Sequence, residues 1–304
     1  SSAGPARCRY HAIPVKNHIC SIMKKCILSL LVLLILVSDG VPASAQAGAD
    51  DYVLVFSDEF NQKNGSQPDP AKWNRHDRYK GTWSRWISNS SDVVYIKNGC
   101  LVCRAIPNSI ERADTAQMLT GAINTKGRFE FQYGKVEVRM KTNRKQGNFP
   151  AAWLAKNNHF GQYGEIDIVE TFGRNTWASH AIHSRLTFNN ESHGQKNIFK
   201  SIDVDVTKWH VYGLIWTESY VRWEIDGKTV AYFEKSKDRE LLDNGQWTFD
   251  FPFYLILNQS VGNGEYGNYG NTRQTYETRF DWVRVYQRKN VENRQQLIQQ
   301  SKHP

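Results

Sequence analysis

The feature that most constrains the fold is a series of short strand-like runs between residues 52 and 286, separated by turn signals. The runs are rich in β-branched and aromatic residues, which favour strands, and they lack any long amphipathic helical pattern. Asp226-Gly227 lies between two alternating runs and predicts a two-residue hairpin. Strands of this length and number predict an all-β fold, a β-sandwich of two sheets. The expected strands are 52–56, 93–97, 101–105, 129–141, 151–154, 165–171, 178–186, 210–216, 220–225, 229–233, 253–259 and 277–286.

A pattern typical of a signal peptide covers residues 23–45. Met23-Lys24-Lys25 precedes an apolar run from Ile27 to Val37, and Ala43-Ser44-Ala45 has the form of a cleavage site. The apolar run is shorter than the roughly 17 residues that a membrane-spanning helix needs. We therefore expect no membrane span, cleavage after Ala45, and a secreted or periplasmic protein.

The remaining segments divide the chain further. We expect residues 1–22, which precede the signal pattern, to be an artefact of an over-extended reading frame. Residues 46–287 are expected to form one domain, because the strand-like runs suit a single domain of this size. Residues 288–304 are polar and Gln-rich, and are expected to form a tail.

Charge argues against a nucleic-acid-binding protein, and the spacing of two cysteines argues against a disulfide between them. The chain has 39 basic and 30 acidic residues, of which residues 1–45 hold five and one, so the remainder has a net charge of only +5. No run of five basic residues is present, so we expect no nucleic-acid partner. Cys100 and Cys103 lie in an expected strand, where residues three apart point to opposite faces. They predict two free thiols rather than a disulfide.

The stretch Gly164–Glu170 places three carboxylates among β-branched residues. Acidic residues are depleted in strands, so such a row indicates a functional site. In a regular strand Glu165 and Asp167 share a face and Glu170 points to the other. We predict a β-bulge at Ile168-Val169, which would return Glu170 to the first face. The carboxyl groups of the two glutamates could then approach to about 5–5.5 Å, the separation typical of a retaining glycosidase.

This acidic strand resembles the signature of glycoside hydrolase family 16. Further resemblances follow in chain order, at residues 56–60, 127–137, 149–154, 216–227 and 280–286. The resemblance implies a jelly roll with a concave substrate cleft and a retaining endo-β-glycosidase. It assigns Glu165 as the nucleophile, Asp167 as the assisting residue and Glu170 as the acid/base. No cofactor is required for this chemistry, the partner would be a polysaccharide or glycan, and we expect a monomer.

Aromatic and polar residues beside the expected cleft are candidates for sugar binding, because sugar rings stack on aromatic faces. A tryptophan at position 153 suits a sugar platform and a core position equally well. A histidine at position 183 matches a histidine of the family near the acid/base, although an interior histidine fits nearly as well. The candidate substrate-binding residues are Trp83, Trp86, Trp153, His183, Asn258, Gln259 and Tyr266.

The resemblance also implies a structural calcium ion on the convex face. By position, its ligands would be Glu59, the carbonyl of Gly99 and Asp281. Oxygen donors of this kind suit Ca²⁺.

The substrate is the least constrained part of this interpretation. The bulged motif resembles members that cut β-1,3- or β-1,3/1,4-glucans. However, no tryptophan follows Gly262, and Phe149 stands where such members usually have tryptophan. An endo-β-1,4-galactosidase acting on poly-N-acetyllactosamine, mucin glycans or algal galactan is therefore an alternative. A carbohydrate-binding sandwich without catalysis is a second alternative, but a pure binder needs no row of acids.

Overall fold

The computed structural model describes residues 52–157, 163–188 and 199–289. The predictions for residues 1–22 and 23–45 concern segments outside these ranges, as does the prediction for nearly all of the tail. Within the described residues, no helix is long and apolar enough to cross a membrane.

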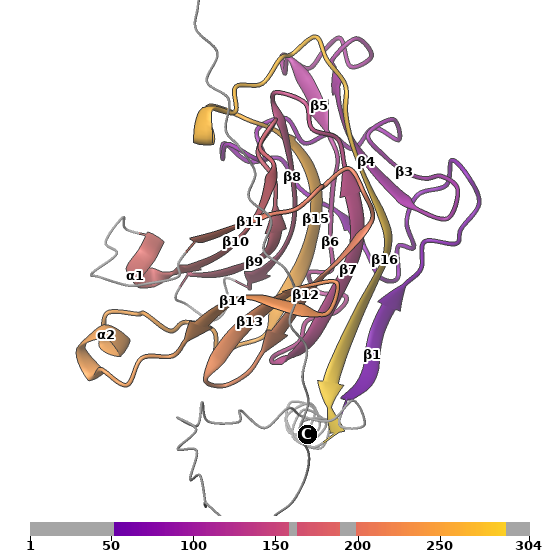
Figure 1. Cartoon of the computed structure of the whole chain (residues 1–304). Coiled ribbons are helices and arrows are strands. Elements are labelled where there is room, and N and C mark those ends of the chain that lie inside the picture. Colours follow the sequence, from indigo (N-terminus) through magenta and orange to yellow (C-terminus); the bar gives the residue numbers. More distant parts are fainter. Residues whose placement is uncertain (1–51, 158–162, 189–198, 290–304) are drawn as a thin grey trace, which may run out of the picture. The chain divides into compact units, whose positions relative to one another are not determined.

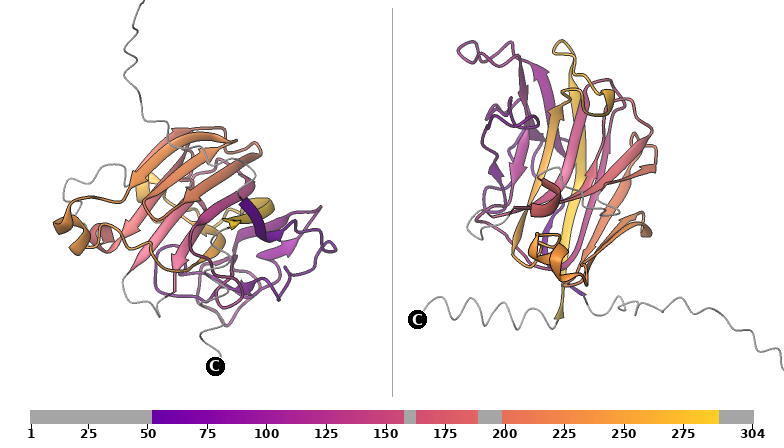
Figure 2. Two further views of the ribbon diagram at one scale, coloured as in Figure 1. Left: turned by 90° about the horizontal axis from the view of Figure 1, so that it is seen from below. Right: turned by 90° about the vertical axis from the view of Figure 1, so that its left-hand side faces the viewer.

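The described residues form two antiparallel sheets (Figures 1 and 2). The nine-stranded sheet has the order β14-β13-β12-β7-β16-β4-β3, with β1 paired to β16 and β5 paired to β4. Its strands are β1 (Tyr52–Asp58), β3 (Val94–Ile96), β4 (Leu101–Pro107), β5 (Met118–Thr120), β7 (Gly134–Thr142), β12 (His210–Trp216), β13 (Tyr220–Ile225), β14 (Lys228–Glu234) and β16 (Tyr276–Arg288).

The seven-stranded sheet has the order β11-β10-β9-β8-β15-β6-β2. Its strands are β2 (Asn74–Arg75), β6 (Ala122–Asn124), β8 (Asn148–Lys156), β9 (Gly164–Glu170), β10 (Trp177–Ser184), β11 (Phe199–Asp203) and β15 (Phe253–Val261). The described helical segments are all short: α1 (Arg185–Phe188), α2 (Arg239–Asp243) and the 3₁₀ turn Glu265–Gly267. The predicted all-β sandwich of two sheets is confirmed.

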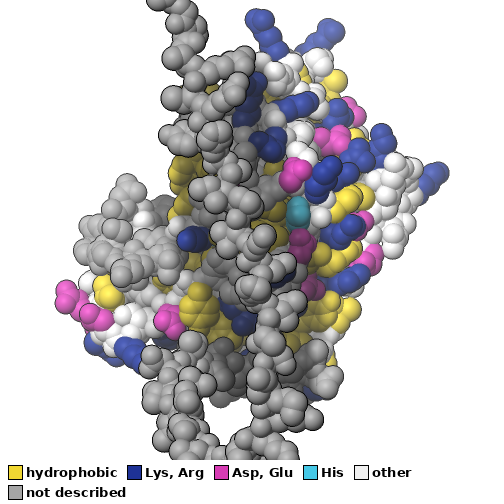
Figure 3. Space-filling view, viewed as in Figure 1, with side chains coloured by type: hydrophobic (Ala, Val, Ile, Leu, Met, Phe, Trp, Pro, Cys, Tyr) yellow, Lys and Arg dark blue, Asp and Glu magenta, His cyan; other side chains and the backbone are white. Residues whose placement is uncertain are grey.

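The main core lies between the two sheets. Strand β7 illustrates how the sequence builds it, because its buried residues alternate with partly exposed ones. Val136, Val138 and Met140 are buried in the core, whereas Lys135 and Glu137 form an ion pair on the other face. On the side of the domain where β4 and β16 lie, Lys and Arg side chains are interspersed with acidic ones (Figure 3). This outer face therefore carries charges of both signs.

The structure confirms the hairpin predicted at Asp226-Gly227 and the two free thiols, and it corrects the predicted ends of two strands. Asp226 and Gly227, both with positive φ, join β13 to β14. Both cysteines are buried and free. The strand expected from residue 129 begins only at Gly134, where a side chain would collide with the carbonyl of Tyr286. Strand β16 extends to Arg288, which pairs with Tyr52, so the domain continues beyond the predicted boundary at 287.

Candidate active site

The bulge predicted in β9 is present. Toward β10, Ala181 pairs with Asp167 and Ser179 with Glu170, so β9 contains one extra residue. Toward β8, Trp153 pairs with Asp167 and Ala152 with Val169, which leaves Ile168 unpaired. As a consequence Ile168 and Val169, although consecutive, both lie in the buried core.

The bulge brings the three acids to the same side of β9. Glu165, Asp167 and Glu170 line one hollow of about 260 Å³. Their neighbours in the adjacent strands are mostly small: Ala155, Trp153 and Ala151 in β8, and His183, Ala181 and Ser179 in β10. Alanine and serine leave room above the acids, so a substrate of sugar size can approach them.

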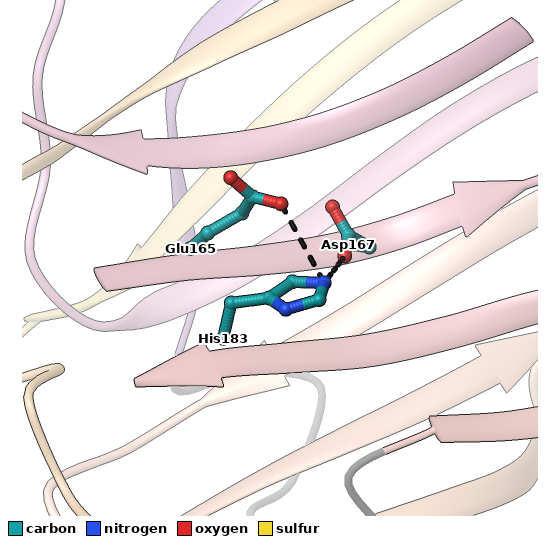
Figure 4. Close-up of side chains that lie close together, drawn as sticks. All are labelled: Glu165, Asp167 and His183. Atoms are coloured by element: carbon teal, nitrogen blue, oxygen red, sulfur yellow. Dashed lines mark ion pairs between the residues drawn. The ribbon is translucent and has the colours of Figure 1, made fainter. Parts of the chain in front are cut away.

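His183 and Tyr163 contact the first two acids. His183 Nε2 lies 3.2 Å from Asp167 Oδ2 and 3.7 Å from Glu165 Oε1, and Figure 4 shows these groups meeting between β9 and β10. The hydroxyl of Tyr163 donates a hydrogen bond of 2.5 Å to Glu165 Oε2. Glu165 therefore has a phenol and an imidazole to orient it.

Burial and mutual repulsion raise the pKa of both glutamates. For Glu165, burial and the charge of Asp167 raise the pKa to about 7, against the opposing effects of His183 and Tyr163. For Glu170, burial and the charges of Asp167 and Glu165 raise the pKa well above its ordinary value. Burial lowers the pKa of His183, but its contact with Asp167 and the nearby glutamate charges raise it to about 10. The site can therefore hold a proton on one carboxyl group at neutral pH.

Three of the predicted binding residues line the hollow. Trp83, Trp153 and Asn258 do so together with the acids, and Trp153 Nε1 donates to Asn258 Oδ1 at 2.8 Å. The rings of Trp83 and Trp153 meet edge to face, with centroids 5.0 Å apart. Both tryptophans also line a second hollow of about 580 Å³, which includes Tyr79 and Tyr254. The two hollows thus share a wall and extend the cleft to one side of the acids.

Two predicted binding residues lie elsewhere. Gln259 follows Asn258 in β15 and so points to the opposite face, where it is buried. Its amide donates to Asn148 Oδ1 and accepts from Thr278 Oγ1, so it has no part in the cleft. Trp86 packs against a small core cluster and under the guanidinium of Arg85, 4.0 Å from its ring centroid. The alternation of β15 and the packing beneath the loop at 81–86 explain these two corrections.

Tyr266 lies in an aromatic cluster. Its ring stacks on Phe199, with centroids 5.1 Å apart, and meets Phe172 and Trp177 edge to face. Tyr266 nevertheless remains 58% exposed, and the charge of Glu170 contributes to raising its pKa after burial does. This cluster therefore lies beside the acid/base candidate.

The two acids expected to bind calcium already have partners. Both carboxylate oxygens of Glu59 accept hydrogen bonds from Arg284 at 2.9 Å, and Asp281 pairs with Arg139. A guanidinium beside each acid supplies the positive charge that an ion would bring, so the donor set as it stands does not fit Ca²⁺. Among the described residues, Glu165, Asp167 and His183 form the group of three acidic, histidine or cysteine side chains whose ligand atoms all lie within 4.8 Å of one another.

Tyr163 is the contact that the sequence interpretation missed. It precedes Glu165 by two residues, and in a strand such residues share a face. That spacing was the available signal, since a phenol on the same face as a buried carboxylate is positioned to donate to it.

Fold and site together define a jelly-roll sandwich with a row of carboxylates in a cleft flanked by aromatic residues. Residues 81–284 match the family described as Glycosyl hydrolases family 16. The chain belongs to this family.

Comparisons with individual proteins agree with this assignment. The keratan-sulfate endo-1,4-beta-galactosidase of Sphingobacterium multivorum is 31% identical over 78% of this chain and 55% of that protein. The glucan endo-1,3-beta-glucosidase A1 of Niallia circulans is 33% identical over 82% of this chain and 40% of that protein. The chain thus spans about half the length of these relatives. The crystal structure of SCLam, a non-specific endo-beta-1,3(4)-glucanase, has a TM-score of 0.68 and 29% identity, covering 79% of this chain and 92% of that one.

Proposed function

We propose that this chain is an endo-acting β-glycosidase that hydrolyses internal linkages of a polysaccharide with retention of configuration. The observation that carries the proposal is the placement of Glu165, Asp167 and Glu170 on one side of β9, in one hollow. A retaining glycosidase needs a nucleophile and an acid/base close together, and a cleft open at the side accommodates an internal linkage.

In the proposed mechanism Glu165 is ionised and its carboxylate attacks the anomeric carbon of the sugar. The carboxyl group of Glu170 donates its proton to the glycosidic oxygen as that bond breaks, which leaves a glycosyl ester on Glu165. The carboxylate of Glu170 then removes a proton from water, which attacks the same carbon and releases the sugar. The phenol of Tyr163 orients Glu165, and Asp167 with His183 sets the local charge.

For the substrate we propose a β-1,3- or β-1,3/1,4-glucan bound along Trp83 and Trp153. The aromatic residues that line the two adjoining hollows support this assignment, because sugar rings stack on aromatic faces. A β-1,4-galactosyl linkage of the keratan or mucin type is the second candidate, favoured by Phe149 at a position where glucanases usually have tryptophan and by the lack of a tryptophan after Gly262. Secretion to the cell exterior or periplasm remains part of the proposal.

Product sizing after incubation with laminarin, lichenan, agarose, keratan sulfate and mucin glycans tests the function. We expect one of these to yield short oligosaccharides from the start of the reaction, as internal cleavage requires. Glu165→Gln and Glu170→Gln should abolish the activity while the protein remains folded. Full activity in either variant, or binding without cleavage by the wild-type protein, would refute the proposal.

A further inference from the structure

Two backbone carbonyl groups at the bulge are satisfied by side chains. Ile168 has no partner in either neighbouring strand. Its carbonyl oxygen lies 2.6 Å from Nδ1 of His180, and the carbonyl oxygen of Asp167 accepts a hydrogen bond of 2.8 Å from Nε1 of Trp223. Both side chains are almost completely buried. The first contact takes up a carbonyl group that the unpaired Ile168 would otherwise bury without a partner, and the second adds a side-chain donor at the preceding residue.

The contact to the carbonyl of Ile168 fixes the tautomer of His180. A carbonyl oxygen only accepts, so Nδ1 of His180 must carry the proton. Burial lowers the pKa of His180 to about 4, so the imidazole is neutral at ordinary pH. Its Nε2 is buried and has no hydrogen-bond partner within the described ranges. His180 therefore has one polar contact to offer, and that contact is with the bulge.

The two donors come from opposite sides of the core. His180 belongs to β10, the neighbour of β9 in the same sheet, whereas Trp223 belongs to β13 in the facing sheet. Their ring centroids lie 6.2 Å apart. The bulge is thus tied both sideways and across the sandwich.

The bulge decides on which face Glu170 lies. With β9 in regular alternation, Glu170 would point to the face opposite that of Glu165 and Asp167. We propose that His180 and Trp223 are positioning residues that hold the bulge and so set Glu170 relative to Glu165. This inference depends on the glycosidase function proposed above.

Four variants separate positioning from packing. H180L removes the donor and keeps an apolar side chain of similar size, whereas H180N retains an N–H group near the position of Nδ1. W223F removes the other donor. W216F is its matched control, because Trp216 is an equally buried core tryptophan whose Nε1 has no hydrogen-bond partner in the described part of the chain.

Two kinds of substrate give the readout. Cleavage of a polysaccharide needs Glu170 as acid and base. The 2,4-dinitrophenyl β-glycosides of laminaribiose and of GlcNAc-β-1,3-galactose have a leaving group that needs no proton, and added azide replaces the water that needs a base. A displaced Glu170 should therefore slow the first reaction far more than the second, whereas a general loss of structure should slow both alike.

We expect H180L and W223F to lose about 100-fold in kcat on the polysaccharide that wild type cleaves, and less than about fivefold on the aryl glycosides with azide. H180N and W216F should stay within about threefold of wild type on both. Equal losses on the two kinds of substrate, or W223F as active as W216F, would overturn the inference. If H180L does not fold, the comparison of W223F with W216F decides whether a donor to the bulge positions Glu170.

A crystal structure of W223F gives a readout that does not require activity. Displacement of Glu170 from the side of Glu165 supports the positioning role, and an unchanged bulge in W223F overturns it. Wild-type protein that cleaves none of the polysaccharides and aryl glycosides would refute the proposed function, and the crystal structure would still decide the role of Trp223.

Discussion

Asp167 and His183 form an ion pair across neighbouring strands, with His183 Nε2 3.2 Å from Asp167 Oδ2. The pair places a positive charge beside Glu165, whose own oxygen lies 3.7 Å from the same nitrogen. Three acids in one hollow repel one another, and an imidazolium offsets part of that repulsion. The site can therefore keep Glu165 ionised while Glu170 retains a proton.

Asp167→Asn should alter the titration of both neighbours. Asp167 is the main cause that raises the pKa of His183 to about 10, against the lowering effect of burial. In the variant His183 should therefore titrate at lower pH. Loss of the Asp167 charge should also lower the pKa of Glu165, so the acid limb of kcat/KM should move to lower pH. NMR titration and a pH–rate profile measure the two effects. His76, whose pKa is lowered mainly by burial, is the internal control. An unchanged titration of His183 would show that Asp167 does not raise its pKa.

Glu165→Gln should stabilise the protein above neutral pH. Burial and Asp167 raise the pKa of Glu165 from 4.5 to about 7. The folded state thus binds this proton more tightly than the unfolded state, so the associated stability is complete below about pH 4.5 and is lost as pH rises through 7. At pH 8 the variant should gain up to about 3 kcal/mol over wild type.

Thermal unfolding at pH 4.5 and pH 8 measures this gain. Glu137→Gln is the matched control, because Glu137 pairs with Lys135 on the outer face of β7. The control should show no gain that grows with pH. A Glu165→Gln gain of the same size at both pH values would contradict the linkage.

Tyr163→Phe should reduce the fraction of Glu165 that is ionised at neutral pH. The hydrogen bond from Tyr163 lowers the pKa of Glu165, so its loss should move the acid limb of the pH–rate profile to higher pH. A hydrogen bond to a charged group is worth about 1.5–3 kcal/mol, so the limb should move by about one pH unit or more. Tyr254→Phe, at a tyrosine that lines the adjoining hollow, should leave the acid limb in place. Identical profiles for the two variants would argue against the role of Tyr163.

The sequence predicted the fold and the acidic row well because both depend on local periodicity. The bulge followed from the spacing of Glu165, Asp167 and Glu170. The prediction that Gln259 binds substrate was wrong. Consecutive residues in β15 point to opposite faces, and Asn258 is the one that reaches the cleft. The supports of the bulge were beyond local reasoning, because Trp223 lies 56 residues from Asp167 along the chain.

Calcium should stabilise the wild-type protein little. Arg284 already makes two hydrogen bonds of 2.9 Å to Glu59. Arg284→Gln removes that positive charge and should make the melting temperature sensitive to Ca²⁺, whereas EDTA should leave wild type within about 1 °C. The expected change in melting temperature is small because replacing Arg284 by Ca²⁺ at the partly exposed carboxylate of Glu59 has little net effect on stability. Strong stabilisation of wild type by Ca²⁺ would show that an ion displaces the arginine.

We propose that Glu165 is the nucleophile and Glu170 the acid/base. The anomeric configuration of the glycosyl azide formed from an activated aryl β-glycoside tests it most directly. Glu165→Ala should give the α-azide, because azide enters from the face that the missing carboxylate leaves open. Glu170→Ala should give the β-azide, because azide attacks the glycosyl ester on Glu165. The reverse pattern, or the same anomer from both variants, would contradict these roles of Glu165 and Glu170.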